Sequence, residues 1–269
     1  MAIVKDISEI KEALSLVEDS GEEWHTNLLE ADDELDSWIR KEQLHIFSTE
    51  GCVFLYRKRY GCRRLYFACS NVSKLKAGLR TVLTKGDGKV IIKILTRKSM
   101  QSVVEEEILQ AGFRYYTSLN RVVKINSATE KKCRQGDFAC EDDMPRIREI
   151  INNNFDNLLD QWPDDDEIIK AINDKRILVI RDKETNQVIA IQSFQKVGMT
   201  LYGRYLASLQ EYRDRMAYGP ILWRQCIKQN CDVKRIVGWI DERNELAIKV
   251  NRAMGFEFDG VNEKVFVYE

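Results

Sequence analysis

A turn of small and basic residues, placed directly before a predicted helix, has the composition of an anion-binding site. The turn runs from Asp214 to Gly219 with small residues at positions 217 and 219, and the helix is predicted to begin near Gly219 or Pro220. The first N–H groups of a helix have no partner within it, and the helix dipole adds positive charge at the same point. The pattern predicts that a phosphate group binds there; the alternative is an ordinary basic loop before a helix.

A second group of residues, near the end of the chain, combines a strand, a capped helix and a further strand. The apolar run at residues 236–240 is typical of a buried strand. Asn244 can cap the helix that follows, and Gly255 can end it in the left-handed conformation that a helix C-terminus often needs. Residues 256–268 contain enough Val, Phe and Tyr to form a strand or a hairpin.

This strand, Asn-headed helix, Gly-Phe pair and strand resemble the C-terminal half of the GCN5-related N-acetyltransferase superfamily, and the resemblance covers about residues 137–269. It implies that Asn244 contacts the arm of coenzyme A and that the turn holds its pyrophosphate. In the superfamily the turn reads Arg/Gln-x-x-Gly-x-Gly/Ala. Here Asp214 stands where Arg or Gln is usual, whereas a start at Arg213 keeps the basic residue and lengthens the loop by one. The cofactor-binding residues implied in this way are Leu209, Arg213, Arg215, Met216, Ala217, Tyr218, Gly219 and Asn244.

Transfer of an acyl group from a thioester to an amine requires a deprotonated amine, a polarised carbonyl and a protonated leaving thiolate. The resemblance implies that a main-chain N–H around residues 207–209 holds the carbonyl. The usual general acid of the superfamily is a tyrosine four residues before the Gly-Phe pair. In this chain that position is Asn251, whose amide can hydrogen-bond a sulfur atom but has no proton to give at neutral pH.

Other residues must therefore be considered for the proton transfers. The nearest tyrosines by sequence are Tyr205, Tyr212 and Tyr218. We expect Tyr218 to act because it lies within the proposed cofactor turn, although its ring can equally pack against the helix. The carboxylates that can act as a base through a water molecule, or remain solvated surface groups, are Glu211, Asp241 and Glu242. The predicted catalytic residues are Tyr218, Glu211 and Asn251.

The chain also shows signs of an internal duplication. Residues 27–34, which begin Asn-Leu-Leu, are echoed by residues 157–167, and each stretch precedes a predicted helix and two strands. Farther on, Gly112-Phe113 and its strand-like run match Gly255-Phe256 and the final strand. The sequence predicts two copies of one α/β fold, each a mixed, mainly antiparallel sheet flanked by helices.

The predicted domains are residues 1–125 and 138–269, joined by a polar linker at 126–137. In the first copy, the strand at 66–70 leads directly into a helix capped by Asn71, without a glycine-spaced turn. Gln101 or Ser102 stands near the place that Asn244 takes in the second copy. We therefore expect the first copy to be a degenerate, non-catalytic domain that supports the second or shapes its substrate site.

Composition limits the other classes of function. With 42 basic and 43 acidic residues the formal charge is −1, which argues against a general nucleic-acid or membrane-surface binder. No apolar run approaches the roughly 20 residues that cross a bilayer. The seven cysteines show no paired Cys-x-x-Cys spacing, which predicts reduced thiols in a cytoplasmic protein rather than a disulfide framework or a zinc site. Only two histidines exist, His25 and His45, so a hydrolase with a histidine base is disfavoured.

The sequence predicts a cytoplasmic N-acyltransferase that uses acetyl-coenzyme A, without a metal, to acetylate an amine of a small molecule or peptide. The acidic run at 164–167 is typical of a helix start, although its charge would also favour a cationic amine. A non-catalytic tandem module for binding or assembly is the alternative, and aminoacyl transfer from charged tRNA is a third reading with less support. The identity of the acceptor, the acyl chain length and the oligomeric state are left open, because fold does not fix function.

Overall fold

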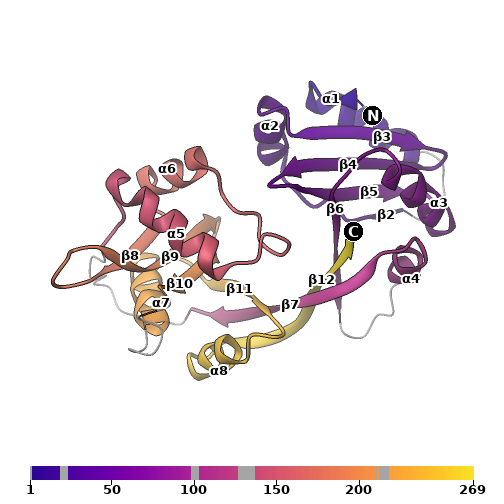
Figure 1. The fold of residues 1–269 in the computed structure, drawn as a ribbon. Coiled ribbons are helices and arrows are strands. Elements are labelled where there is room, and N and C mark those ends of the chain that lie inside the picture. The colour runs from indigo at the N-terminus through magenta and orange to yellow at the C-terminus, as the bar shows by residue number, and fades with distance from the viewer. Residues whose placement is uncertain (1, 19–23, 98–102, 127–136, 210, 212–217) are drawn as a thin grey trace. The chain divides into compact units, whose positions relative to one another are not determined.

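The structure, a computed structural model, describes residues 2–18, 24–97, 103–126, 137–209, 211 and 218–269. It divides into two compact units, which are coloured by residue number in Figure 1. Unit 1 consists of Met1–Leu119 together with Gly260–Glu269, and unit 2 is Asn120–Asp259. Each unit contains a sheet with helices packed on its faces.

Unit 1 is built on the strand order β1-β3-β4-β5-β6-β12, with the short strand β2 beside β5. Neighbours from β3 to β5 are antiparallel, whereas β5 and β6 are parallel. The elements in chain order are β1 (Ala2–Ile3), α1 (Ile7–Glu18), β2 (His25–Thr26), α2 (Asp32–Arg40), β3 (Leu44–Thr49), β4 (Cys52–Arg59), β5 (Cys62–Cys69), α3 (Val72–Leu83), β6 (Lys89–Arg97), α4 (Val103–Gln110) and β7 (Arg114–Ile125).

Unit 2 repeats this plan with the strand order β7-β11-β10-β9-β8. Its strands β8, β9 and β10 are antiparallel, and β10 and β11 are parallel. The elements that follow β7 in chain order are η1 (Glu141–Asp143), α5 (Met144–Asn154), α6 (Asp165–Asn173), β8 (Ile177–Arg181), β9 (Val188–Val197), β10 (Thr200–Ser208), α7 (Tyr218–Gln229), β11 (Arg235–Asp241), α8 (Glu245–Ala253) and β12 (Glu257–Tyr268), which passes into unit 1 at Gly260.

The two units therefore share one topology, as the internal repeat predicts. In each, two helices precede an antiparallel three-stranded run, and a helix then connects its last strand to a parallel neighbour. The crossover helix is α3 in unit 1 and α7 in unit 2. The predicted fold class, a mixed and mainly antiparallel sheet flanked by helices in two tandem copies, is confirmed.

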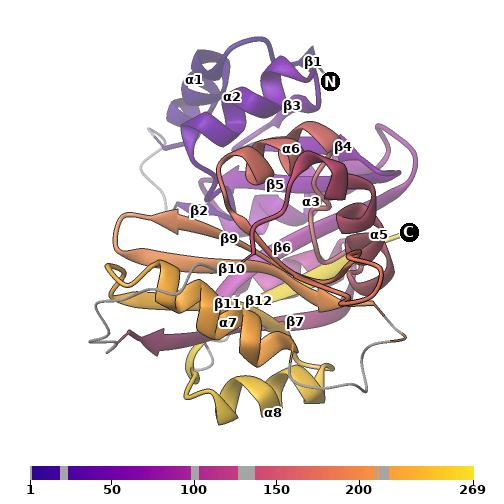
Figure 2. The same cartoon turned by 90° about the vertical axis from the view of Figure 1, so that its left-hand side faces the viewer.

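Both faces of each sheet are buried under helices, which explains the long apolar runs of the strands. In unit 2, Trp223 and Cys226 of α7 pack on one face, while Ile147 of α5 and Ile168 of α6 pack on the other. Figure 2 shows α7 and α8 beside the strands that they cover. In unit 1 the corresponding faces hold Leu75 and Leu79 of α3, and Ile10 and Trp38 of α1 and α2.

Local signals in the sequence set several helix ends. Asn244 caps α8 by accepting a hydrogen bond from the Ala247 N–H at 3.0 Å, and Gly255 follows the helix with a φ of 79°. The acidic run before α6 forms a capping box, in which the Asp164 and Glu167 side chains each accept a hydrogen bond from the other residue's N–H. These are the capping roles predicted from the sequence.

The two compact units are not simply the two halves of the chain, because strands β7 and β12 each contribute to both units. The predicted domains follow the chain, with a boundary at residues 126–137, but β7 crosses from unit 1 to unit 2 after Leu119 and β12 crosses back after Asp259. Each strand has 12 residues, about twice the usual length, so one strand can serve both units. Most of the predicted linker lies outside the described residues.

The final stretch of β12 is firmly part of unit 1. Val261 to Tyr268 pair antiparallel with β6, and Val265, Phe266 and Val267 are at most 1% exposed. Two ion pairs add to this pairing, Lys93–Glu263 at 2.6 Å and Lys264–Glu105 at 2.7 Å. The last strand is therefore as much a core strand of unit 1 as those at its beginning.

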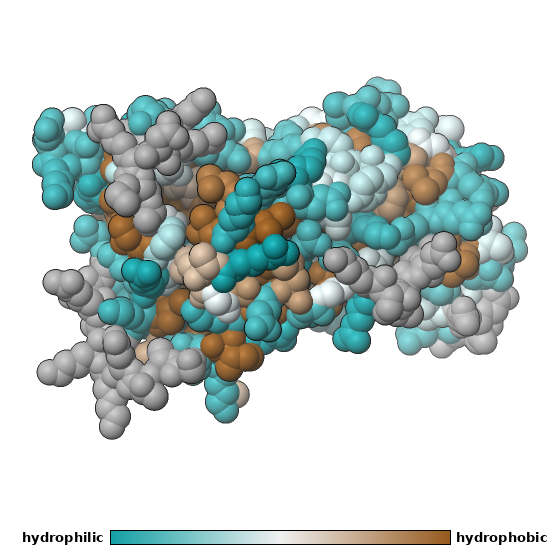
Figure 3. All heavy atoms as spheres, turned by 90° about the horizontal axis from the view of Figure 1, so that it is seen from below, coloured by the Kyte–Doolittle hydropathy of each residue, from teal (hydrophilic) through white to brown (hydrophobic). Residues whose placement is uncertain are grey.

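Not every apolar side chain is buried. Figure 3 shows apolar residues reaching the surface among hydrophilic ones on the face seen there. In unit 2 the exposed apolar side chains include Val197, Met199 and Leu246. Within the described residues, no helix is long and apolar enough to span a membrane.

Candidate functional site

The most distinctive feature of unit 2 is that its parallel strands β10 and β11 separate after only three paired residues. Thr200, Leu201 and Tyr202 pair with Arg235, Ile236 and Val237, and the pairing stops there. On its other side β10 continues to pair with β9 as far as Ser208. A gap, called here the strand opening, therefore lies along β10 beyond Tyr202.

A β-bulge in β10 lies where the two strands separate. Gly203 pairs with Phe194 and Leu206 pairs with Gln192, so Arg204 and Tyr205 together oppose a single residue of β9. A bulge of this kind bends its strand and increases the local twist. It therefore accounts for β10 turning away from β11 at this point.

The register decides which main-chain groups of β10 face the strand opening. The Leu209 N–H donates to the Ile189 carbonyl at 2.9 Å, so Leu209 faces β9. Along an antiparallel strand alternate residues face opposite neighbours, so Ala207 also faces β9, while Leu206 and Ser208 face the opening. In the described part of the chain, the N–H groups of Leu206 and Ser208 form no hydrogen bond on that side.

The sequence predicts a carbonyl-binding amide around residues 207–209, and of these three residues Ser208 directs its N–H to the strand opening. Leu209, named from the sequence among the cofactor-binding residues, is 3% exposed and uses its N–H within the sheet. Its main-chain donor is therefore not available to a ligand. The N–H of Ala207, two residues earlier, likewise faces β9.

Helix α7 begins beside the strand opening. An added Cβ on Gly219 would lie 3.6 Å from Cδ2 of Leu206, which places the first turn of the helix next to β10. An added Cβ on Gly203 would lie 2.6 Å from the Trp223 ring, so this glycine lets α7 pack closely on the strand. The predicted anion-binding residues Arg213, Arg215, Met216 and Ala217, and also Tyr212, lie outside the described residues.

The first turn of α7 carries N–H groups that the helix itself cannot satisfy. Tyr218 and Gly219 each supply one, whereas Pro220 has none. Tyr218 is half-buried and its side chain packs against both cores of unit 2. Packing of the Tyr218 ring, one of the two roles considered from the sequence, is therefore present.

The two asparagines of α8 have different surroundings. Asn244 is exposed, and its Oδ1 caps the helix as described above. Asn251 is 8% exposed, and its Nδ2 donates to the Ala247 carbonyl at 2.9 Å. The Asn251 carbonyl in turn accepts from the Phe256 N–H at 3.0 Å, so this residue ties the end of the helix together.

The remaining candidates for proton transfer are partly engaged. The Tyr205 hydroxyl donates to the Gln161 carbonyl at 2.5 Å, and its ring meets that of Phe155 edge-on at 5.0 Å. The Arg243 guanidinium forks onto both carboxylate oxygens of Asp241, the closest contact being 2.6 Å. Glu211 has a side chain that is 62% exposed and lies 4.0 Å from the Arg146 guanidinium.

An ion pair with a buried aspartate joins η1 to β8 in unit 2. The Arg181 side chain donates to both oxygens of Asp143, at 2.8 and 2.7 Å, and the Cys140 N–H donates to one of them at 2.8 Å. Burial on its own would raise the pKa of Asp143, but the hydrogen bonds from Arg181 and Cys140 outweigh it and hold the pKa below its ordinary value. This pair has a structural role.

Unit 1 has the same strand opening, but its own chain fills it. The parallel pairing of β5 and β6 also ends after three residues, at Arg64 and Ile91. Beyond that point β2 pairs with β5, with His25 opposite Cys69 and Thr26 opposite Ala68. The β2 segment, residues 25–27, thus takes the place that is open along β10.

The Asn27 side chain completes this closure. Its Nδ2 donates to the carbonyls of Leu65 on β5, at 3.2 Å, and of Lys93 on β6, at 3.0 Å, so it bridges the two separated strands. Its Oδ1 accepts the Phe67 N–H at 2.6 Å. Counted from the last parallel pair and allowing for the bulge, Phe67 corresponds to Leu206 of unit 2. A carboxamide therefore occupies in unit 1 the main-chain site that unit 2 leaves open.

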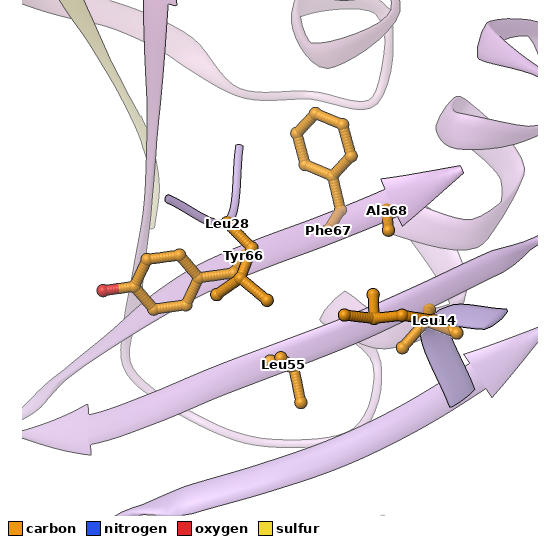
Figure 4. Close-up of a pocket in the computed structure, with 7 residues that line it drawn as sticks. Leu14, Leu28, Leu55, Tyr66, Phe67 and Ala68 are labelled. Atoms are coloured by element: carbon orange, nitrogen blue, oxygen red, sulfur yellow. The ribbon is translucent and has the colours of Figure 1, made fainter. Parts of the chain in front are cut away.

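Sequence reasoning missed this closure. Asn27 was recognised as a landmark of the repeat, but nothing in its local pattern indicates that it bridges two distant strands. The depression in Figure 4, lined by Leu14, Leu28, Tyr66 and neighbouring apolar residues, leaves no room for a water molecule. Among the described residues, no group of three or more His, Cys, Asp or Glu side chains is placed to hold a metal ion.

Comparison with solved structures identifies the fold of the chain, whereas comparison of sequences does not. No protein-family model and no curated protein matches the sequence. Among solved structures, a tandem GNAT protein from the clavulanic acid biosynthesis pathway superimposes with a TM-score of 0.62 at 10% identity, covering 100% of this chain and 97% of its own. A GCN5-related N-acetyltransferase from Sphaerobacter thermophilus gives 0.57 at 12% identity, covering 98% and 91%. An acetyltransferase of the GNAT family from Colwellia psychrerythraea gives 0.54 at 10% identity, covering 98% and 97%. Over its whole length, the chain has the tandem fold of the GCN5-related N-acetyltransferases.

Proposed function

We propose that this protein is an N-acyltransferase that transfers an acetyl group from acetyl-coenzyme A to an amine of a small molecule or peptide. We further propose that unit 2 alone carries the site. The observation that carries the proposal is the strand opening, where the N–H groups of Leu206 and Ser208 face outward beside the start of α7. Main-chain N–H groups fixed in a sheet are suited to hold amide and thioester carbonyls.

The fit to acetyl-coenzyme A follows from three groups of this chain. The Ser208 N–H would hold the thioester carbonyl, the Leu206 N–H an amide of the pantetheine arm, and the first turn of α7 the pyrophosphate. Asn244 would meet the same arm from the start of α8. The stretch Arg213 to Ala217 belongs to the proposed phosphate site by sequence alone.

In the reaction, the amine lone pair forms the new C–N bond and the C–S bond of the thioester breaks. The amine must lose a proton and the leaving thiolate must gain one. Glu211, whose side chain is exposed, is the base that we propose, acting through a water molecule. A thiol has a pKa of about 8.5, so its thiolate can leave without a dedicated acid at modest cost.

The source of the proton is less constrained by the fold. The usual tyrosine position is Asn251, which is tied to the helix backbone. The hydroxyl of Tyr205 is directed to the Gln161 carbonyl. We therefore propose Tyr218 or solvent as the proton donor, and Tyr218 remains the residue to substitute first.

The closure of unit 1 supports a single site per chain. A ligand that used the Phe67 N–H would have to displace Asn27, which makes three hydrogen bonds there. This adds a second reason, besides the missing glycine-spaced turn, to regard unit 1 as non-catalytic. Its role would be to support unit 2 or to shape access to it.

The direct test is calorimetry of the full chain with acetyl-coenzyme A. We expect one site per chain, whose affinity falls in a Gly219→Trp variant, because the new ring would fill the space beside Leu206. Gly219→Ala is the matched control, since its Cβ would make only an ordinary contact there. Two equivalent sites, or equal affinity in the Gly219→Trp variant, would count against the proposal.

A non-catalytic binding or assembly module is the second candidate, and the identity of residue 251 is the observation in its favour. Single-turnover acetyl transfer to a panel of amines and lysine peptides separates the two. Tight binding of acetyl-coenzyme A with no transfer to any acceptor, in the parent and in Asn251→Tyr, would favour the binding module.

A further inference from the structure

Two cysteines of unit 1 lie directly opposite each other across neighbouring strands. Cys52 begins β4, Cys69 ends β5, and the register pairs them. Both side chains point into the core beneath α3, and both residues are 0% exposed. This arrangement is separate from the proposed acetyl-transfer site.

The register also brings the two thiols close together. The neighbouring pair is hydrogen-bonded, since the Ser70 N–H donates to the Gly51 carbonyl at 3.1 Å. In an antiparallel ladder the next pair is then a non-hydrogen-bonded one, in which the Cα atoms lie about 4.5 Å apart and the side chains are nearest. That separation is within the range of about 4.4 to 6.8 Å that a disulfide spans.

The two sulfurs already interact, and unequally. The hydrogen bond from the Cys69 thiol is the main cause that lowers the pKa of Cys52; burial opposes it and the nearby Lys74 ammonium assists it. The same hydrogen bond, together with burial, raises the pKa of Cys69. Of the two, Cys52 is the sulfur whose pKa is lowered, and the Cys69 thiol is the hydrogen-bond donor beside it.

We propose that Cys52 and Cys69 form a reversible disulfide when the protein meets a hydroperoxide. The Cys52 thiolate attacks the peroxide oxygen and breaks the O–O bond, which gives a sulfenic acid and hydroxide. The Cys69 sulfur then attacks the Cys52 sulfur, the S–O bond breaks, and water leaves. In total two thiols and one hydrogen peroxide give one disulfide and two waters, and a dithiol reductant reverses the change.

The position of Cys69 gives the disulfide a structural consequence. Cys69 pairs with Cys52 on β4 and with His25 of the β2 segment. At this residue β5 therefore lies between β4 and β2. Oxidation would link β4 to β5 covalently beside the segment that closes unit 1. We therefore expect the oxidised protein to melt at a higher temperature than the reduced protein.

Other thiols of the chain provide internal controls. Cys62 lies at the opposite end of β5, is also buried, and has Arg59 rather than a cysteine across from it. Cys226 is buried in unit 2, where burial raises the pKa of its thiol. Cys226 lies on helix α7, and no described cysteine lies opposite Cys62 on a neighbouring strand, so neither thiol matches the Cys52–Cys69 pair.

The test treats the full chain with hydrogen peroxide, blocks the remaining thiols by alkylation, and maps tryptic peptides by mass spectrometry. We expect a linked pair of peptides containing Cys52 and Cys69 in the parent and in Cys62→Ser, lost on reduction with dithiothreitol and absent in Cys69→Ser. The rise in melting temperature should follow the linked peptides. The map of the unsubstituted protein is informative even if Cys69→Ser fails to fold. Oxidation that stops at sulfinic acid, or that links other cysteines while Cys52 and Cys69 remain thiols, would overturn the proposal.

Discussion

The proposed reaction depends on the main-chain N–H of Ser208, which would hold the thioester carbonyl. Ser208→Pro removes this N–H and nothing else from the main chain, and the group faces the strand opening rather than β9, a place where proline is tolerated in a sheet. If the N–H polarises the thioester carbonyl, acetyl transfer should fall by about 10²- to 10³-fold. Single-turnover rates are the measurement.

Ser208→Ala is the control, because it keeps the N–H and should retain the parent rate. Circular dichroism and melting temperature of both variants guard against a general loss of structure. An unchanged rate in a folded Ser208→Pro protein would mean that the carbonyl is held elsewhere.

Asn244 combines two roles that can be separated by substitution. Its Oδ1 caps α8, while its Nδ2 is available to a ligand at the start of that helix. Asn244→Ala should weaken binding of acetyl-coenzyme A by about 1 to 2 kcal/mol, through loss of one hydrogen bond and part of a cap. Asn244→Asp keeps the cap, removes the Nδ2 donor and adds a negative charge.

Calorimetry on these two variants, with Asn251→Ala beside them, provides the comparison. Binding that is weakened in Asn244→Ala and retained in Asn244→Asp would assign the loss to the cap rather than to a contact with the ligand. A loss confined to Asn251→Ala would show that the opposite end of α8 meets the cofactor.

Asp143 links stability to pH. Its pKa is lowered in the folded protein, so it adds stability above the pKa of the unfolded chain, about 3.9, and this stability is lost as the pH falls through the folded value. Asp143→Asn should cost about 3 kcal/mol at pH 7, because it leaves Arg181 without its charge partner. It should also flatten the fall in stability below about pH 4.

Urea denaturation at pH 7 and at pH 3 measures both effects. The neighbouring Asp142→Asn is the control, since Asp142 is exposed. Equal losses in the two variants would mean that the ion pair contributes nothing specific.

At the scale of elements, β2 is the part of unit 1 whose role can be tested directly. Asn27→Ala removes three hydrogen bonds and leaves the Phe67 N–H and two carbonyls without their partner. We expect a loss of about 2 to 4 kcal/mol in unfolding free energy. Leu29→Ala, at a side chain that is 66% exposed, should be nearly neutral.

Affinity for acetyl-coenzyme A should be the same in Asn27→Ala as in the parent, because the proposed site is in unit 2. A second molecule of acetyl-coenzyme A bound by Asn27→Ala would instead show that Asn27 masks a working site in unit 1.

The elements differ in how far the sequence determines them. Asn71, Asn244, Asp164 and Gly255 act on their own neighbours, so the ends of α3, α8 and α6 could be predicted. The strand opening itself depends on register. The one-residue bulge after Gly203 decides that Ser208, and not Leu209, faces the opening, and no local pattern records that choice. The bridge from Asn27 to Lys93 joins residues far apart in the chain and was likewise invisible.

At the scale of the whole molecule, the duplication was readable because each copy repeats short landmarks in the same order. The exchange of strands was not, because the residues of β7 and β12 mark them as strands without recording which strands they pair with. The proposed site within residues 207–219 also remains a prediction at Arg213 to Ala217, which lie outside the described residues.

The position of β12 in the sheet of unit 1 has a consequence for folding during synthesis of the chain. Gly260–Glu269 emerge from the ribosome only after all of Asn120–Asp259, an interval of roughly 7 to 28 s at about 5 to 20 residues per second. During that interval β6 lacks its antiparallel neighbour and presents unpaired N–H and C=O groups to any passing strand. The nascent first half is thus an incomplete sheet for as long as the second half takes to make. Chaperones or fast translation would then limit mispairing of the β6 edge.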